Sequence, residues 1–135
     1  MEKVKKFFSE NDKFARECGI ELLSVEEGKA VARMKVEPRH HNGVNIAHGG
    51  AIFTLADFAF ASASNSHGTV AVAINVSISY IKAHSTGYLY AYARELSKNS
   101  KLGCYTVEIK NENDELIAIF QGMVYRKNEQ LKIES

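Results

Sequence analysis

The stretch that decides the fold is His40–Gly68, which reads HHNGVNIAHGGAIFTLADFAFASASNSHG. It contains no Lys, Arg or Glu, and Asp57 is its single formal charge. Over residues 50–65 the apolar side chains recur at about 100° per residue, which predicts a helix. Both faces of this helix are apolar or small, so we expect it to be buried nearly all round. One face carries Ile52, Leu55, Ala56, Ala59 and Ala63, and the other carries Gly50, Phe53, Thr54, Asp57, Ala61 and Ser64.

Alternating polar and apolar residues flank this helix on both sides. Upstream, IELLSVE and KAVARMKVE predict two strands joined across the Glu27-Gly28 turn. Downstream, TVAVAINVSISYI predicts a long strand, and YLYAYARELS, LGCYTVEIK and ELIAIFQGMVYR predict three more. The connections KNSK and NEND are too short for crossover helices, so the last three strands form an antiparallel meander. We expect the long strand to have one apolar face, formed by Val70, Val72, Ile74, Val76, Ile78 and Tyr80, and one face of small residues, formed by Ala71, Ala73, Asn75, Ser77 and Ser79.

The order of the elements predicts an α+β fold. Helical spacing over residues 2–17, with Gly19 as the stop, predicts one amphipathic N-terminal helix. Two strands, the central helix and four strands follow, which gives a six-stranded antiparallel sheet. A sheet that holds one fully buried helix must curl around it. The whole chain, residues 1–135, is expected to form a single domain.

Composition and charge exclude several classes of protein. The chain is 45% hydrophobic and 24% charged with a formal net charge of +1, which does not favour nucleic acid or an anionic membrane as a partner. Cys18 and Cys104 have no metal-ligand spacing, and we interpret them as reduced thiols of a cytoplasmic protein. The charged N-terminus lacks a signal-type apolar core, and no stretch approaches the ~20 apolar residues of a membrane helix. We therefore expect a cytoplasmic protein with no metal site.

The lone carboxylate of the central helix requires an explanation. An ionised Asp57 in this apolar setting is costly unless it is paired or hydrogen-bonded. One interpretation is structural, with Asp57 as the N-cap of a shorter helix that begins at Phe58. The other interpretation is chemical, because His48-Gly49-Gly50 directly precedes the helix.

A helix N-terminus offers unpaired N–H groups and a partial positive charge. Glycines at this point let a ligand approach the backbone, so Gly49 and Gly50 would polarise a thioester or ester carbonyl and stabilise the oxyanion formed on attack. The alternative is that the two glycines form a plain turn. Asn42 and His48 would orient a substrate or a water, or would satisfy backbone groups of their own loop.

The spacing along the helix predicts a homodimer. Gly50 and Asp57 are separated by two turns, on the order of 10 Å along the axis. An attacking carboxylate and an oxyanion donor must both lie within about 3–3.5 Å of the same carbonyl group, which one helix hardly allows. Two antiparallel helices packed across a two-fold axis would bring the N-terminus of each to Asp57 of the other. The long strand Val70–Tyr80 would pair with its own copy across the same axis.

Three groups of residues together resemble the signature of the hotdog-fold thioesterases. They are Asn42-Gly43, His48-Gly49-Gly50 and Leu55-Ala56-Asp57. The segment SNSHG…SYIKA after the helix and the order of the strands extend the resemblance from about Gly19 to Tyr125. The group that the chain resembles most is that of the phenylacetate-degradation (PaaI-type) acyl-CoA thioesterases. The resemblance implies a hotdog fold, in which the six-stranded antiparallel sheet wraps around the central helix.

The resemblance also implies a role for each residue of the motif. The N–H of Gly49, with Gly50 beside it, would hold the thioester carbonyl. Asp57 of the neighbouring subunit would act as nucleophile or as general base on water. Asn42 would position the attacking group, and His48 would support the loop. No metal or redox cofactor is implied, because coenzyme A is part of the substrate, and the family implies a homodimer that pairs into a dimer of dimers.

The chain departs from the family pattern on the long strand and just after it. Some relatives hold water with a hydroxyl residue where this chain has Ala73, and Asn75 or Ser77 would substitute for it. Relatives often carry Arg-Pro where this chain has Lys82-Ala83. The phosphates of coenzyme A need cations, for which the candidates are Lys82, Lys98 and Lys101, although surface lysines are commonly just solvated.

These observations predict an enzyme that hydrolyses an acyl-CoA thioester. Small residues beside Phe53 and Phe60 permit a pocket for an aryl or medium-length acyl group. A non-catalytic acyl-CoA binding protein is an alternative, but such a protein would not require a carboxylate facing the helix N-terminus. A hotdog dehydratase or hydratase is a further alternative, and it would need the His48 side chain to face the acyl chain.

Overall fold

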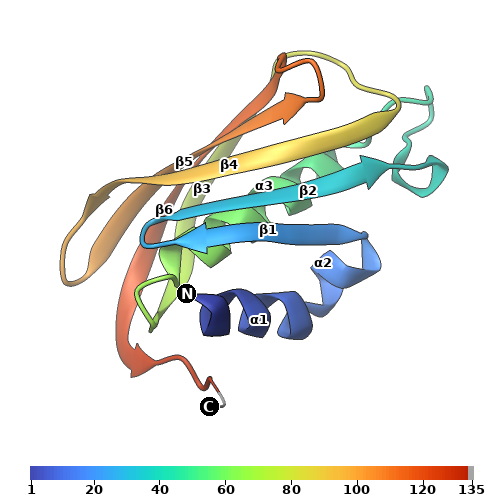
Figure 1. Cartoon of the computed structure of the whole chain (residues 1–135). Coiled ribbons are helices and arrows are strands. Elements are labelled where there is room, and N and C mark those ends of the chain that lie inside the picture. The colour runs from blue at the N-terminus through green and yellow to red at the C-terminus, as the bar shows by residue number, and fades with distance from the viewer. Residues whose placement is uncertain (134–135) are drawn as a thin grey trace.

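The apolar stretch forms one long helix, α3 (Gly49–Ser64), and a six-stranded antiparallel sheet curls around it (Figure 1). The structure is a computed structural model that describes residues 1–133. The strands lie in the order β1-β2-β4-β5-β6-β3. This arrangement confirms the α+β class and the curled sheet. The strands are β1 (Ile20–Glu26), β2 (Lys29–Val36), β3 (Thr69–Tyr80), β4 (Gly87–Lys98), β5 (Leu102–Asn111) and β6 (Leu116–Gln130).

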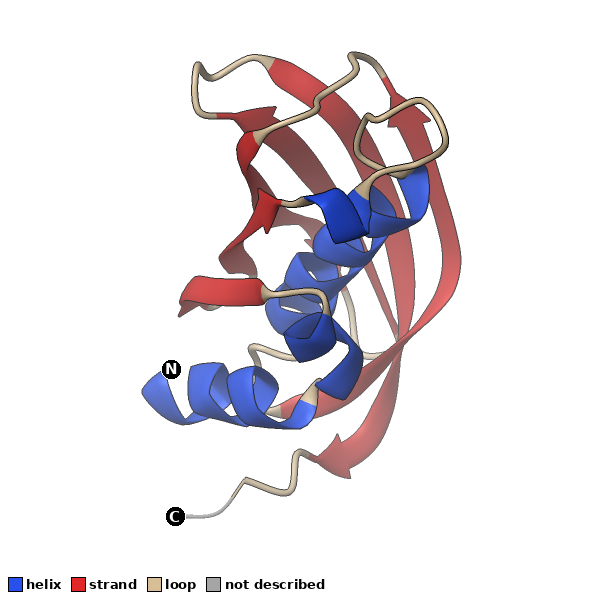
Figure 2. Ribbon diagram, turned by 90° about the vertical axis from the view of Figure 1, so that its right-hand side faces the viewer, coloured by secondary structure: helices blue, strands red, loops and turns tan. Residues whose placement is uncertain are grey.

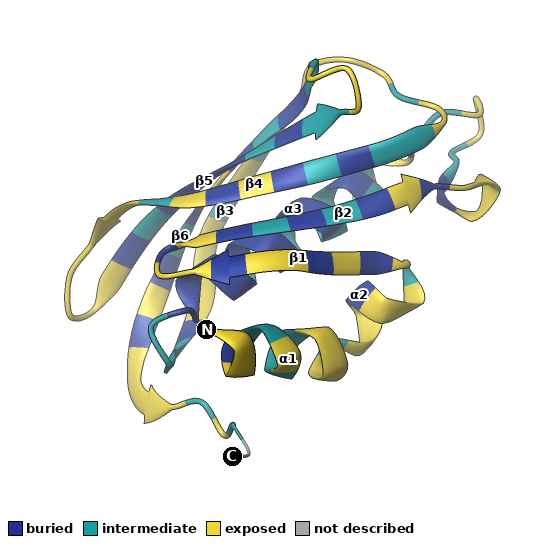
Figure 3. Ribbon diagram, in the orientation of Figure 1, coloured by how far each residue is buried: buried dark blue, intermediate teal, exposed yellow. Residues whose placement is uncertain are grey.

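The core lies between α3 and the concave face of the sheet, as Figures 2 and 3 show. Leu55, Ala56 and Ala59 of α3 are fully buried, as the helical pattern predicts. The small residues of α3 let the helix lie close to the sheet. At Gly122 of β6 an added Cβ would lie 2.6 Å from the Phe60 ring, so the sheet accepts this ring only where the facing residue is glycine.

The N-terminal helix is not continuous, which corrects the prediction of one helix over residues 2–17. α1 (Glu2–Asn11) ends before Asp12, and the Asp12 side chain accepts a hydrogen bond of 3.1 Å from the Ala15 N–H at the start of α2 (Lys13–Glu17). A local side-chain acceptor of this kind competes with the helical hydrogen bonds and favours a new N-terminus. Because of the break, Phe14 leaves the apolar stripe and is 67% exposed.

The long strand β3 has no single apolar face, which is a second correction. Its pairing with β6 shifts between Ala73 and Asn75, so that Ile74 forms a bulge. A bulge adds one residue to one strand and reverses which side chains point to each face beyond it. Val72 and Ile74 are therefore 41% and 54% exposed on the outer face, while Ile78 packs against the core.

Within the described residues, one edge strand of the sheet is covered by helices, and the other is not. The edge strand β1 packs against α1 and α2 (Figure 1). β3 forms the opposite edge, and within residues 1–133 it pairs only with β6. An unpaired edge of this length offers its backbone groups to another strand.

Candidate active site

The N-terminus of α3 presents one unengaged amide. A 3-10 turn, η1 (Pro38–His40), leads into the loop before the helix. His48 is the N-cap of α3, and its Nδ1 atom accepts a hydrogen bond of 2.8 Å from the Gly50 N–H. The Gly50 amide, predicted to contact the substrate, is therefore engaged by His48. The Gly49 N–H has no acceptor within residues 1–133.

His40 ties the loop to the rest of the chain, and the sequence analysis missed this role. The His40 side chain is buried, with Nδ1 accepting from the Glu37 N–H at 2.9 Å and Nε2 donating to the Cys18 carbonyl at 2.8 Å. The His40 carbonyl accepts from the His48 N–H at 2.7 Å. This chain of bonds holds the helix start against the beginning of β1. No short motif marks the bond to Cys18, because this carbonyl lies 22 residues from His40 in the sequence.

A cleft of about 290 Å³ opens beside the helix N-terminus. It brings together three of the predicted site residues, namely Asn42, Gly49 and Lys82. Its remaining wall is largely apolar and is formed by Ile46, Ala47, Ile52, Tyr80, Ile81, Ala83 and His84.

Two of the polar residues of the cleft have partners in the chain. The side-chain Oδ1 atom of Asn42 accepts from the N–H groups of Val44 and Ile46, so the side chain also shapes its own loop. Lys82 forms an ion pair with Glu115 and both side chains are exposed. A lysine with a carboxylate partner is a weaker phosphate ligand than a free one, because the partner already compensates its charge.

Asp57 lies in the middle of α3, which rules out the alternative that it caps a shorter helix. It is eight residues from Gly49, or about 12 Å along the helix axis. Its side chain is half-buried, and within residues 1–133 it forms no hydrogen bond or ion pair. Burial, and next the negative charge of Asp12, raise the pKa of Asp57 above its ordinary value.

The other predicted contact residues lie away from the cleft. Asn75 and Ser77 pair with Met123 and Gln121, whereas the intervening Gly122 faces the Phe60 ring, so both polar side chains lie on the outer face of the sheet. The bulge at Ile74 is the reason, since it separates them from the face of Ala73.

Lys98 and Lys101 lie at the β4–β5 hairpin, at the opposite end of the molecule from the Gly49 amide (Figure 1). Arg126 of the adjoining strand β6 contacts both this hairpin and the end of α3, because its backbone N–H donates to the Lys101 carbonyl at 2.6 Å and its guanidinium donates to the Ser64 carbonyl at 3.1 Å. A single chain therefore does not bring the two lysines to the cleft.

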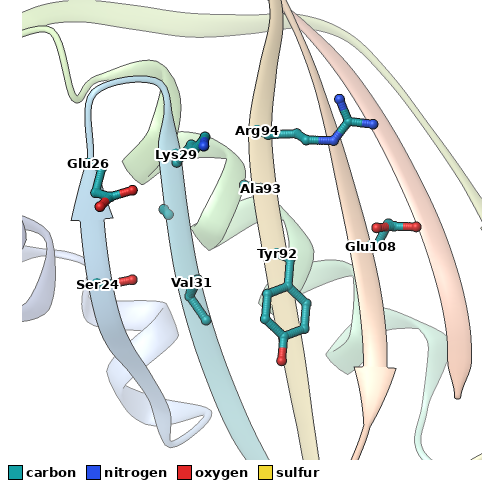
Figure 4. A pocket seen from close by; sticks show the side chains of 9 residues that line it. Ser24, Glu26, Lys29, Val31, Tyr92, Ala93, Arg94 and Glu108 are labelled. Carbon is teal, nitrogen blue, oxygen red and sulfur yellow. The ribbon is translucent and has the colours of Figure 1, made fainter. Parts of the chain in front are cut away.

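A separate shallow pocket lies on the outer face of the sheet, and Figure 4 shows α3 on the far side of the strands from it. Glu26, Lys29, Arg94 and Glu108 bring charges of both signs to this pocket, beside the Tyr92 ring. None of the residues predicted for chemistry lines it, so we assign the candidate site to the cleft at the N-terminus of α3.

Comparison with known proteins identifies the class of this architecture. The family described as "Thioesterase superfamily" matches residues 44–118. A putative esterase of Archaeoglobus fulgidus is 46% identical over 130 residues, which cover 96% of this chain and 84% of that protein. The acyl-coenzyme A thioesterase PaaI of Escherichia coli is 39% identical over 118 residues, covering 87% of this chain and 84% of the relative.

A solved structure of the E. coli PaaI protein superposes with a TM-score of 0.91 at 35% identity, and the match covers 96% of both chains. The fold is thus the hotdog fold, and the class of protein is a hydrolase that acts on thioester bonds. The chain belongs to the thioesterase superfamily, in which it is a PaaI-type member. No helix within residues 1–133 is long and apolar enough to cross a membrane.

Proposed function

We propose that the protein hydrolyses an aryl- or medium-chain acyl-CoA to the free acid and coenzyme A, with Gly49 and Asp57 as the reacting groups. The observation that carries this proposal is the unengaged Gly49 N–H at the head of a buried helix, inside an apolar cleft. The relative of known activity, PaaI of E. coli, is named an acyl-coenzyme A thioesterase.

The Gly49 amide acts on the thioester carbonyl. A carbonyl oxygen within about 3 Å of this N–H would be polarised by the bond and by the partial positive charge of the helix end. The negative charge that develops on this oxygen during attack strengthens both interactions. The amide therefore binds the transition state more tightly than the substrate.

Asp57 supplies the attacking group. As a nucleophile its carboxylate attacks the thioester carbon and expels the coenzyme A thiolate, and water then hydrolyses the anhydride. As a general base it takes a proton from water, which attacks the same carbon. Both routes require the ionised carboxylate and a lone pair without a competing partner, and the absence of a hydrogen bond to Asp57 within residues 1–133 supports this requirement.

The two groups act in a composite site between two copies of the chain. A separation of about 12 Å along one helix exceeds the reach of a single reacting carbonyl. The free edge of β3 and the partly exposed face of Thr54, Asp57 and Ala61 are both available to a second copy. A two-fold dimer would hold two sites, each with Gly49 from one protomer and Asp57 from its partner, and two dimers would form the tetramer.

The remaining contacts follow from the dimer. Lys98 and Lys101 are exposed and form no ion pair within residues 1–133, so they are available to the phosphates of coenzyme A bound to a partner protomer. Lys82 would also bind these phosphates once it is released from Glu115. Asn42 would position the attacking water or carboxylate. Asn75 and Ser77 remain proposed contacts from the outer face of β3. The reaction uses groups of the chain and water, with no cofactor, and the free thiols of Cys18 and Cys104 are compatible with a cytoplasmic location.

The test is release of free coenzyme A thiol from a panel of acetyl-, medium-chain, long-chain and aryl-acyl-CoA substrates. We expect the highest kcat/KM for aryl or medium-length acyl groups, because the cleft wall is apolar but of limited volume. Binding of acyl-CoA without thiol release would show a non-catalytic binding protein. With a 2-enoyl- or 3-hydroxyacyl-CoA added to the panel, gain or loss of water with the thioester intact would show a hydratase or dehydratase.

A further inference from the structure

Tyr80, the last residue of β3, touches the start of α3. Its hydroxyl donates a hydrogen bond of 2.8 Å to the Gly49 carbonyl. Its ring lies so close to Gly49 that an added Cβ there would be 3.1 Å from the Tyr80 Cζ and Oη atoms. The same side chain lines the cleft and is 52% exposed.

This contact reaches the peptide next to the unengaged amide. Gly49 donates nothing within residues 1–133, while its carbonyl accepts from Tyr80 and the following N–H, that of Gly50, donates to His48 Nδ1. The Gly49–Gly50 peptide is thus held on both of its polar sides by side chains. A peptide held in this way cannot rotate without the loss of two hydrogen bonds, and the orientation of the neighbouring Gly49 N–H is restricted with it.

We infer that Tyr80 is a positioning residue for thioester hydrolysis: its hydroxyl holds the Gly49 carbonyl, and its ring closes one side of Gly49 so that the carbonyl of the substrate reaches the amide from the cleft. This inference rests on the proposed function. Glycine at position 49 fits this contact, since a Cβ there would lie 3.1 Å from the Tyr80 ring and the ring would have to shift. Burial raises the pKa of the Tyr80 hydroxyl, so the group remains a donor at neutral and moderately alkaline pH.

The matched test compares Tyr80→Phe with Tyr125→Phe. Tyr125 is an exposed tyrosine of β6 that faces outward and is 43% exposed, so its variant removes a hydroxyl away from the cleft. In Tyr80→Phe we expect kcat to fall about three- to tenfold, the effect of losing one hydrogen bond, with KM within about twofold of wild type. We expect both parameters to be unchanged in Tyr125→Phe.

Amide hydrogen exchange at residues 50–53 supplies a readout independent of turnover. Loss of the bond to Gly49 should speed exchange in this turn about three- to tenfold in Tyr80→Phe and not in Tyr125→Phe. Unchanged exchange, or faster exchange with wild-type kcat, would overturn the inference. A wild-type protein that hydrolyses no thioester would instead contradict the proposed function, and the exchange data would still decide whether Tyr80 anchors the helix.

The role of the ring is tested by adding a methyl group at Gly49. Gly49→Ala keeps the N–H but meets the Tyr80 ring, so we expect it to lower kcat in the wild-type background. The same substitution should cost less in a Tyr80→Ala background, where the ring is absent. Equal costs in the two backgrounds would show that the ring does not control access to Gly49.

Discussion

Asp57 carries a destabilising charge at the place where the proposed chemistry needs one. Its pKa is raised by burial and by Asp12, so the folded protein holds the neutral acid better than the unfolded chain does. Relative to higher pH, the neutral Asp57 favours the folded state below the unfolded pKa of about 3.9. This gain in the free energy of unfolding is lost as the pH rises through the folded pKa. Asn at this position would remove the cost of the charge and the reactive lone pair together.

We expect Asp57→Asn to lower kcat at least about 10²-fold, because the amide neither attacks carbon nor takes a proton effectively. At neutral pH the variant should melt at or above the wild-type temperature, and this difference should shrink below about pH 4. Thiol-release kinetics and calorimetry measure the two effects. Near wild-type turnover in the folded variant would refute the catalytic role.

Gly49 is the second residue whose backbone is expected to act directly. Gly49→Pro removes the N–H at the first helical position, where proline fits the backbone and its missing donor costs the helix nothing. We expect turnover to fall below detection while circular dichroism stays like that of wild type. Gly49→Ala is the matched control, since it makes a similar contact with Tyr80 but keeps the N–H. Activity in the proline variant would show that another donor polarises the thioester.

At the scale of elements, the break between α1 and α2 adds to the effect of burial on the one carboxylate of α3. It places the carboxylate of Asp12 where its charge raises the pKa of Asp57. The same carboxylate caps α2. Because Asn caps a helix about as well as Asp, the capping and electrostatic roles can be separated by one substitution.

Asp12→Asn should therefore lower the pKa of Asp57 without unfolding α2. The ionised form of Asp57 is the reactive one, so the acid limb of the kcat/KM profile should move to lower pH, and the shift should shrink in high salt. Glu10→Gln removes the same charge from the neighbouring helix and serves as the control, because Glu10 is not among the groups that raise this pKa. Equal profiles for all three proteins would mean that Asp12 does not influence the reacting carboxylate.

At the scale of the whole molecule, the sheet edge β3 and the exposed side of α3 favour the same two-fold dimer. The dimer is tested by mixing Asp57→Asn and Gly49→Pro subunits, each inactive alone, under conditions that exchange subunits. A composite site predicts that a mixed dimer contains one intact site, so random pairing should restore about a quarter of wild-type activity. Mixed dimers that are detected by mass spectrometry but have no activity would place the site within one chain.

The sequence by itself determined the fold class, and it singled out the polar groups of the proposed site. The helical period and the apolar faces of residues 50–65 required a sheet to cover the helix, although the face of Thr54, Asp57 and Ala61 stays partly exposed where near-complete burial was expected. The short connections required antiparallel strands. The glycines before the helix and the lone Asp57 could be recognised because helix ends and apolar helices constrain residue type locally. The pattern of β2 was likewise confirmed, since Ala30, Ala32 and Met34 are buried as alternation predicts.

Only the tertiary structure decided which of the candidate residues lie together. The bulge at Ile74 depends on the register of β3 against β6, which periodicity along one strand does not specify, and it moves Asn75 and Ser77 to the outer face. The contacts of His40 with Cys18 and of Tyr80 with Gly49 join residues 22 and 31 positions apart. Such contacts form only when distant segments of the chain come together in the fold. A local periodicity in the sequence does not predict them.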